Sequence, residues 1–295
     1  MIFIIKITIE NEKYPDKLRK IKNPPKQLYL KGNVELLNKN IISIIGSRNC
    51  TENGKKLAKK FASELSNQGF VIASGMAKGI DSQAHIGTLE AKGKTIAVLG
   101  NGLNCIFPKE NKELYDEILK NDGLIISEYS PDTEPSSELF LERNRIVSGI
   151  SIGILVVEAA FRSGTSVTAK FAKEQGKKIF GLPHEIGDRH GIGTNKLIRQ
   201  GATLVTSTIE IIEEFEFLKY KEIEKQAKED NKKKLRNKEH QKIYELIERG
   251  VANINEICKK SGKSIKEINN ILLILEIEGY IIKSAGGYKC VWNKK

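Results

Sequence analysis

The stretch Ile41–Arg48 constrains the fold more than any other part of the chain. A nearly continuous isoleucine run, Ile41 to Ile45, stops at Gly46, and helically spaced apolar residues follow from Leu57 to Leu65 before Gly69. An apolar run bounded by turn residues predicts a strand buried on both faces, and the later spacing predicts an amphipathic helix. The stretch therefore predicts a strand–turn–helix unit of an α/β protein.

The loop after this strand is suited to an anion. A loop between a parallel strand and a helix N-terminus presents backbone N–H groups in front of the positive end of the helix dipole. Gly46, Ser47 and Arg48 add a short hydroxyl and a planar guanidinium, which suit a phosphate or a carboxylate. The alternative is that Gly46 serves a tight turn and Arg48 is a surface charge.

Two common nucleotide-binding loops do not match this stretch. A dinucleotide loop needs a glycine where Arg48 stands, and the next apolar run ends in Ser74-Gly75 without the acidic residue that binds a ribose. A Walker loop needs Ser or Thr after its lysine, whereas Lys56 follows Lys55. We therefore expect no nicotinamide or flavin site, and no cofactor.

Further strand-like runs alternate with helical patterns along the chain. They are Phe70–Ala73, Thr95–Leu99, Leu124–Ile126, Ile152–Val157 and Lys178–Leu182. This alternation predicts a Rossmann-like, doubly wound and mostly parallel sheet. Ligands bind such sheets beyond the carboxyl ends of the strands, where the polar and glycine-rich segments of this chain stand.

One predicted helix between two of these strands carries Phe140, Arg143, Asn144 and Arg145. Phe140, Arg143 and Asn144 share a stripe by their spacing. An aromatic ring beside arginines suits a nucleobase stacked over a held phosphate. The alternative is that Phe140 belongs to the core and that the arginines form a solvated face.

Composition favours a polyanionic partner and a reducing compartment. The formal net charge is +12, although a solvated lysine-rich surface would give the same value. The four cysteines are dispersed, without ligand-spaced histidines, so we expect no disulfide framework, no metal site and a cytoplasmic location. The apolar start, Met1 to Ile9, is interrupted by Lys6 and predicts a strand instead of a signal peptide, and no later run is long enough to span a membrane.

The chain is expected to contain four parts. These are an approach segment packed on the sheet (1–40), the Rossmann-like domain (41–216), a charged linker (217–236) and a winged-helix domain (237–295). The last part has three helical patterns followed by a hairpin pattern across Gly286-Gly287. Its presumed recognition helix, from Ser264, carries Glu267, Glu276 and Glu278 as well as Lys266, so docking to another protein is at least as well supported as reading a DNA groove.

Taken together, these motifs resemble the DNA-processing protein A family, also called DprA or Smf. The similarity runs from about Tyr14 to Glu213, and its order and spacing are specific. The matching motifs are Tyr14-Pro15, Pro24-Pro25, Gly46-Ser47-Arg48, Ser74-Gly75 with Ala77, Gly79-Ile80-Asp81 and Ala84-His85, Ser127-Glu128, Arg143 to Ile146, Glu158-Ala159, Ser163-Gly164-Thr165, Gly193-Thr194-Asn195 with Leu197-Ile198, and Gly201-Ala202. Two departures are Pro183-His184-Glu185, where Pro-Gly is usual, and Ser166-Val167-Thr168, where Leu-Ile-Thr is commoner.

The resemblance implies a homodimeric protein that binds single-stranded DNA and loads the RecA recombinase onto incoming strands during natural transformation. It implies a strand pocket around Gly46, Ser47, Arg48, Arg143 and Arg145, to which we add Phe140 from its neighbourhood. The full expected set of DNA-binding residues is Gly46, Ser47, Arg48, Ser74, Gly75, Lys78, Phe140, Arg143, Asn144, Arg145, Ser163, Gly164, Thr165 and Lys170.

The strongest competing hypothesis is an enzyme similar to the phosphoribohydrolases that act on nucleotide monophosphates. Their Pro-Gly-Gly-x-Gly-Thr-x-x-Glu loop corresponds to Phe161–Thr168, which contains no glutamate. Asp81 and His85, four apart on a predicted helix, could form an acid–base pair, but a capping aspartate and a packed histidine are the commoner explanation. We therefore expect a binding protein without catalytic residues. A regulator of double-stranded DNA is disfavoured by the acidic recognition helix.

Overall fold

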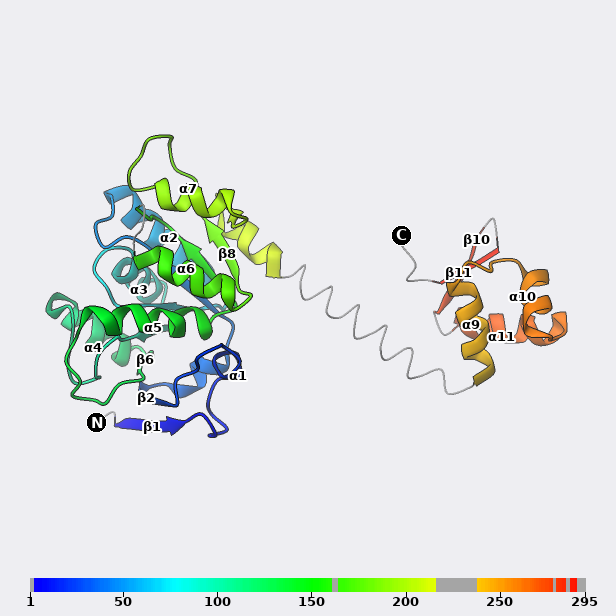
Figure 1. Ribbon diagram of the computed structural model, residues 1–295, viewed down its shortest axis with the longest axis horizontal. Helices are drawn as coiled ribbons and strands as arrows, with labels where there is room; N and C mark the ends of the chain where they lie inside the picture. The colour runs from blue at the N-terminus through cyan, green and yellow to red at the C-terminus, as the bar shows by residue number, and fades with distance from the viewer. Residues whose placement is uncertain (1–2, 161–163, 216–237, 278–279, 285–286, 291–295) are drawn as a thin grey trace. The chain divides into compact units, whose positions relative to one another are not determined.

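The computed structural model describes residues 3–160, 164–215, 238–277, 280–284 and 287–290 (Figure 1). The chain divides into two compact units, Met1–Ile212 and Glu213–Lys295, which are described separately below. The linker predicted at 217–236 lies outside the described residues. None of the described helices is long and apolar enough to cross a membrane.

The described part of the first unit is built on a nine-stranded sheet with the order β1-β2-β6-β5-β4-β3-β7-β8-β9. The strands are β1 (Ile4–Thr8), β2 (Gln27–Gly32), β3 (Ile41–Ile45), β4 (Val71–Ser74), β5 (Thr95–Val98), β6 (Leu124–Ser127), β7 (Gly153–Val156), β8 (Lys178–Gly181) and β9 (Thr203–Leu204). From β6 to β9 all neighbours are parallel. The mostly parallel α/β sheet predicted from the apolar runs is confirmed.

Strand β3 lies where the strand order reverses. Its register pairs Ile42 with Ile72 of β4 on one side and Ile44 with Leu155 of β7 on the other. All five residues of β3 are buried, as the isoleucine run predicted. The crevice beyond the carboxyl end of such a strand is where open α/β sheets bind ligands.

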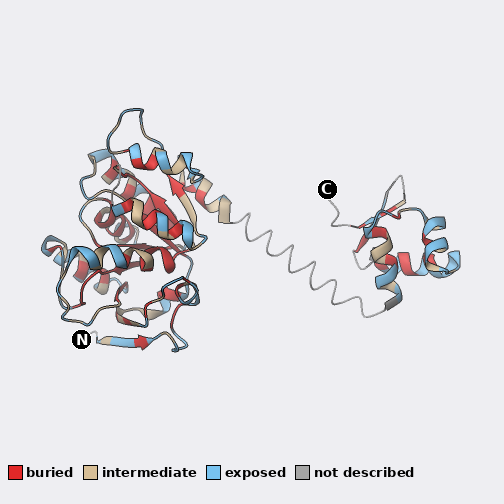
Figure 2. Cartoon of the chain, viewed as in Figure 1, coloured by how far each residue is buried: buried red, intermediate tan, exposed pale blue. Residues whose placement is uncertain are grey.

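Helices cover both faces of this sheet. They are α1 (Asp16–Arg19), α2 (Glu52–Asn67), α3 (Ile80–Glu90), α4 (Lys112–Lys120), α5 (Ser137–Gly149), α6 (Gly164–Glu174) and α7 (Ile192–Arg199), with 3₁₀ turns η1 (Val34–Asn38) and η2 (Lys109–Asn111). Helix α5 packs on α1 and α6, whereas α3 packs on α2 and α4. Buried residues are concentrated in the sheet and on the helices that cover it (Figure 2).

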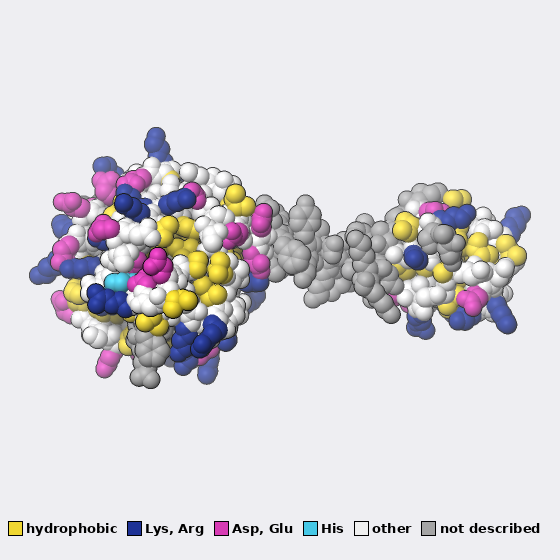
Figure 3. Space-filling model, turned by 90° about the horizontal axis from the view of Figure 1, so that it is seen from above, with side chains coloured by type: hydrophobic (Ala, Val, Ile, Leu, Met, Phe, Trp, Pro, Cys, Tyr) yellow, Lys and Arg dark blue, Asp and Glu magenta, His cyan; other side chains and the backbone are white. Residues whose placement is uncertain are grey.

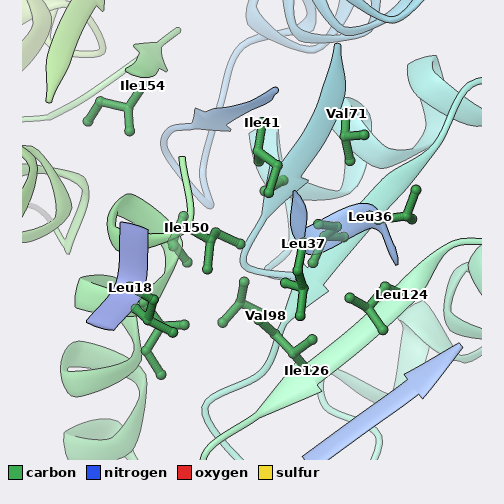
Figure 4. Packing of buried hydrophobic residues seen from close by; sticks show 14 of the residues in the cluster. Leu18, Leu36, Leu37, Ile41, Val71, Val98, Leu124, Ile126, Ile150 and Ile154 are labelled. Carbon is green, nitrogen blue, oxygen red and sulfur yellow. The ribbon is translucent and has the colours of Figure 1, made fainter. Parts of the chain in front are cut away.

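The main core lies between the sheet and the layer of α1, α5 and α6. Figure 4 shows Leu18 of α1 and Ile150, next to α5, pointing toward the strand side chains Ile41, Val98 and Ile126. All five of these side chains are fully buried. Burying one such side chain stabilises the fold by about 1.5–3 kcal/mol, so this layer dominates the stability of the unit.

The first forty residues do more than pack on the sheet. Strand β2 pairs antiparallel with β6, and β1 pairs antiparallel with β2, so both extend the sheet beyond its parallel part. Leu28 and Leu30 of β2 are fully buried, and the edge of β6 would otherwise leave its backbone groups without partners. The approach segment predicted from the sequence is therefore two strands of the domain itself.

The described part of the second unit contains three helices and a hairpin. They are α9 (Lys238–Glu248), α10 (Ile254–Ser261), α11 (Ile265–Ile277), β10 (Ile281–Ser284) and β11 (Gly287–Cys290). Ile243, Ile257, Ile268 and Leu272 join Ile281 of the hairpin in a core of their own. This arrangement confirms the winged-helix domain.

Because each unit has its own core, we expect a chain truncated after Phe215 to fold. It should give an α/β circular dichroism spectrum and a single cooperative thermal transition, at the temperature of the corresponding transition in the full chain. If thermal unfolding of the truncated chain shows no cooperative transition, the first unit depends on the second for its stability.

Candidate functional site

A cleft of about 600 Å³ lies beyond the carboxyl ends of β3 and β4. The loops after these strands, with helices α5 and α6, form its walls. Nine of the predicted residues line it: Gly46, Ser47, Arg48, Gly75, Phe140, Arg143, Asn144, Gly164 and Thr165. Ser74, Lys78, Arg145 and Lys170 are not among the lining residues, and Ser163 lies outside the described residues.

Glu158, which follows β7, anchors the loop that carries Arg48. Its backbone carbonyl accepts a hydrogen bond from Ser47 N at 2.9 Å. Its carboxylate accepts from Thr51 N at 3.0 Å and from Thr51 Oγ1 at 2.5 Å, and the residue is only 1% exposed. A side chain at Gly54 would collide with this carboxylate, because an added Cβ would lie 2.3 Å from Glu158 Oε1.

The start of α2 is therefore already occupied by a negative charge from within the chain. Thr51 is the N-cap residue, and its hydroxyl also accepts from Gly54 N at 2.9 Å. The sequence predicted that this helix N-terminus would be open to an external anion. In the structure the buried carboxylate of Glu158 accepts hydrogen bonds there from Thr51, whereas the side chain of Arg48 is exposed at the cleft.

Arg48 is exposed and lies over an aromatic pair. Its guanidinium carbon is 5.8 Å from the centroid of the Phe140 ring, within range of a cation–π contact. Phe140 stacks on Phe107, with ring centroids 5.3 Å apart and an angle of 22° between the planes. Arg48 forms no ion pair within the described chain, so its donors remain available to a ligand. Phe107 was not predicted, because it lies far from the arginines in the sequence.

Gly79 sets the distance between this loop and α3. Its φ is +82°, and an added Cβ would lie 2.4 Å from the carbonyl oxygen of Ser47. The amide of Ile80, the next residue, donates to the same oxygen at 3.2 Å. Only glycine combines this backbone conformation with so close an approach, which holds Ser47 and Arg48 at the cleft.

Arg143 lies in the floor of the cleft and is only 4% exposed. Its Nη1 donates to the carbonyl of Gly75 at 2.7 Å and to that of Val98. Beside it, Asp81 Oδ2 accepts from Gly75 N at 3.1 Å. Burial lowers the pKa of Arg143 to about 10 and raises the pKa of Asp81. These bonds tie the ends of β4 and β5 to α5, so Arg143 supports the cleft, whereas Arg48 is exposed at its surface.

The other predicted cations have carboxylate partners. Arg145 forms a bidentate pair with Glu128, at 2.7 and 2.6 Å, and both side chains are mostly buried. Lys78 Nζ is 2.7 Å from Glu110 Oε1, in an exposed pair. Lys170 Nζ is 3.9 Å from Glu174, on the far side of α6. Arg145 is thereby committed to structure, whereas exposed lysine pairs are weak enough to exchange partners.

Two predicted polar residues hold elements together around the cleft. Ser74 is fully buried, and its hydroxyl donates to the carbonyl of Ile44 at 2.6 Å, which links the ends of β4 and β3. Asn144 Nδ2 donates to the carbonyl of Gly164 at 3.5 Å, between α5 and α6. Both residues therefore contribute to the shape of the cleft.

His85 is packed in the core and does not line the cleft. Its Nδ1 lies 2.7 Å from Thr95 Oγ1, whose proton is donated to the carbonyl of Ile72 at 2.7 Å. Nδ1 is therefore the protonated nitrogen, and Nε2 is buried without a hydrogen-bond partner in the described structure. Burial, with a smaller effect from Arg143, lowers the pKa of His85 to about 3. This geometry favours a packed histidine over half of an acid–base pair.

No group of three or more His, Cys, Asp or Glu residues is arranged to hold a metal ion in the described ranges. On the face of the first unit shown in Figure 3, acidic and basic side chains are interspersed. On that face the charges therefore form no patch of one sign.

Comparison with known proteins gives two family matches. The model of the DNA recombination-mediator protein A family matches residues 6–216, and that of the DprA winged helix domain matches residues 226–287. Protein Smf of Escherichia coli is 35% identical over 289 residues, which cover 96% of this chain and 76% of that protein. DNA processing protein DprA of Streptococcus pneumoniae is 43% identical over 210 residues, covering 71% and 74%.

Two solved structures have the same fold as the first unit. DNA processing protein A of Streptococcus pneumoniae superposes with a TM-score of 0.69 at 41% identity, covering 72% of this chain and 74% of that one. DNA processing protein A of Helicobacter pylori, whose structure concerns its single-stranded DNA binding mode, gives a TM-score of 0.64 at 33% identity, covering 71% and 95%.

The buried imidazole of His85 should make stability depend on pH. Its pKa is about 3 in the folded chain and near 6.5 in the unfolded chain, so only the unfolded chain binds the proton between these values. The free energy of unfolding should therefore fall as pH drops from about 6.5, by up to about 1.4 kcal/mol per pH unit from this group. Urea unfolding of wild type and His85→Gln between about pH 4.5 and 6.5 measures the two slopes. Equal slopes would contradict the assignment.

Replacing Arg143 should lower the free energy of unfolding of the chain more than replacing Arg48. Arg143→Ala removes the positive neighbour of Asp81 and leaves two buried carbonyls without their donor, at a cost of about 1–3 kcal/mol for each carbonyl. Arg48→Ala, at an exposed position, should cost about 0.5 kcal/mol or less. Urea denaturation of both variants makes the comparison. Equal stabilities would show that Arg143 is not a structural residue.

Proposed function

Because the chain belongs to the DNA recombination-mediator protein A family, we propose that it binds single-stranded DNA in the cleft beyond β3 and β4. The observation that supports this most directly is the position of the exposed Arg48 guanidinium over the Phe140 ring. Arg48 offers a cation for a phosphate, and its planar guanidinium, backed by the Phe140–Phe107 pair, offers a surface on which a base can stack.

The chemistry of the pair favours a single strand over a duplex. A planar guanidinium takes two phosphate oxygens in a bidentate contact, and the backbone that carries Arg48 is held by the contacts of Ser47 and Gly79. A base can stack on an aromatic side chain only when it is free of its own neighbours in a duplex. Such contacts do not depend on the base sequence of the DNA, so the proposed binding tolerates strands of any sequence.

We extend the proposal to the cellular role implied by the family. The protein would protect incoming strands in the cytoplasm and load the RecA recombinase onto them during natural transformation, as a homodimer. Protein–protein contacts of this kind need surface outside the strand cleft. The winged-helix unit offers one: α11 exposes Leu273 and Ile274 beside Glu267 and Glu276, a face that suits a protein better than phosphates.

Arg48→Ala should weaken binding of a labelled oligothymidylate by about 10- to 100-fold, because a charge-assisted contact is worth about 1.5–3 kcal/mol. Arg48→Lys should recover only part of the loss, since an ammonium keeps the charge but not the bidentate hydrogen-bond geometry of the guanidinium. Fluorescence anisotropy titrations measure the affinities, with thermal melts alongside.

Arg249→Ala is the matched control, because Arg249 is an exposed arginine of the second unit. It should bind the oligothymidylate like wild type, and wild type should bind a duplex of the same length more weakly. Wild-type affinity in Arg48→Ala would refute the cleft as the strand site. Equal affinity for duplex would refute the preference for single strands.

A further inference from the structure

A second cleft, of about 500 Å³, lies between α6, α7 and the strands β8 and β9. Five lysines line it: Lys170, Lys173, Lys177, Lys178 and Lys196. No Asp or Glu is among the described residues that line it. Gly176 and Gly201 contribute walls without side chains, and an added Cβ at either would meet no atom within 4 Å, so an extended chain can approach the backbone closely there.

The charged form of Lys177 is energetically unfavourable in this cleft. Its side chain is half-buried, and Nζ donates to the carbonyl of Gly149 at 3.2 Å, with no carboxylate partner within the described chain. Burial, and to a lesser degree repulsion from Lys17, lowers its pKa to about 8. A bound anion would relieve both effects.

Helix dipoles explain only part of the lysine cluster. Lys173 and Lys196 lie in the last turns of α6 and α7, where cations complement the negative helix ends. Lys170 stands a turn earlier in α6, and Lys177 and Lys178 follow the helix. Lys170 is paired only with the exposed Glu174, at 3.9 Å, which is a weak contact.

Helix α6 separates this lysine cleft from the cleft at Arg48. Its residues Gly164, Thr165 and Thr168 line the first cleft, whereas Ser166, Lys170 and Lys173 line the second. An α-helix with its side chains is only about 10–12 Å across. A strand that leaves the first cleft over α6 therefore reaches the second within a short stretch of backbone.

We propose that the lysine cleft binds the phosphodiester backbone of the same single strand after it crosses α6. The inference rests on the proposed function and adds a second contact region to it. Lysine ammonium groups act as point charges that donate hydrogen bonds to phosphates in many orientations. This suits a DNA backbone that is bound without regard to base sequence. This assigns a role to Lys170, which does not line the first cleft.

The test compares a variant of the three exposed lysines, Lys170→Gln with Lys173→Gln and Lys196→Gln, with a matched control. The control changes three exposed lysines outside both clefts, Lys22→Gln, Lys60→Gln and Lys92→Gln. Lys177 is left intact because it is half-buried and bonded to Gly149. Oligothymidylates of about 5 and about 25 nucleotides bracket the site sizes usual for one binding surface.

The expected result is a length-dependent loss. The lysine-cleft variant should bind the short oligonucleotide like the control but the long one about 10-fold more weakly. The slope of its log affinity against log salt, for the long oligonucleotide, should be smaller by about 2, which is three phosphates at about 0.7 each. Equal affinity and slope for the two variants on the long oligonucleotide would overturn the proposal while leaving the first cleft as the strand site.

Three further outcomes would also overturn it. If wild type binds neither oligonucleotide, the proposed function fails and this inference fails with it. If poly-glutamate binds wild type as tightly as the long oligonucleotide does, and loses this affinity in the lysine-cleft variant, the cleft takes an acidic protein segment. If light scattering shows that the lysine-cleft variant, and not the control, changes oligomeric mass, the cleft is a contact between copies of the chain.

Discussion

The buried carboxylate of Glu158 is the interaction on which the cleft depends. It lies beside β3, where the strand order reverses, and it joins the end of β7 to the start of α2 through Thr51. The backbone of the same residue holds Ser47. Because a charged group this deeply buried is stable only with its hydrogen bonds made, the loop has one position, and Arg48 is presented from it.

Three arginines near the cleft have three different roles, although the sequence places them in similar company. Arg48 is exposed over Phe140, Arg143 is bonded to backbone carbonyls beside Asp81, and Arg145 is paired with Glu128. The buried cations hold strands and helices in place and are shielded from a ligand. In the function we propose, the electrostatic attraction for a polyanion therefore rests on Arg48 and on the exposed lysines, and salt should affect binding strongly.

The two units divide the surface chemistry between them. The first carries the cleft at Arg48 and the lysine cleft, whereas α11 of the second exposes Leu273 and Ile274 among charged residues of both signs. Exposed apolar side chains of this kind can be buried against a protein partner. Strand binding and partner recognition can in this way be served by separate cores that fold by themselves.

Local patterns in the sequence determined the elements of this protein, and tertiary structure decided the roles of its charges. The isoleucine run of β3, the alternating strands and helices, the winged helix and the family motifs were all predictable, because each depends on spacing within one segment. The joining of β1 and β2 to the sheet was not, since strand pairing depends on which edge is left open. The partners that set the roles of the charges lie 17 residues apart for Arg145 and Glu128, 68 for Arg143 and Gly75, and 107 for Thr51 and Glu158. Only the folded chain brings such groups within hydrogen-bond distance, and that distance decides whether a cation supports the cleft or faces its ligand.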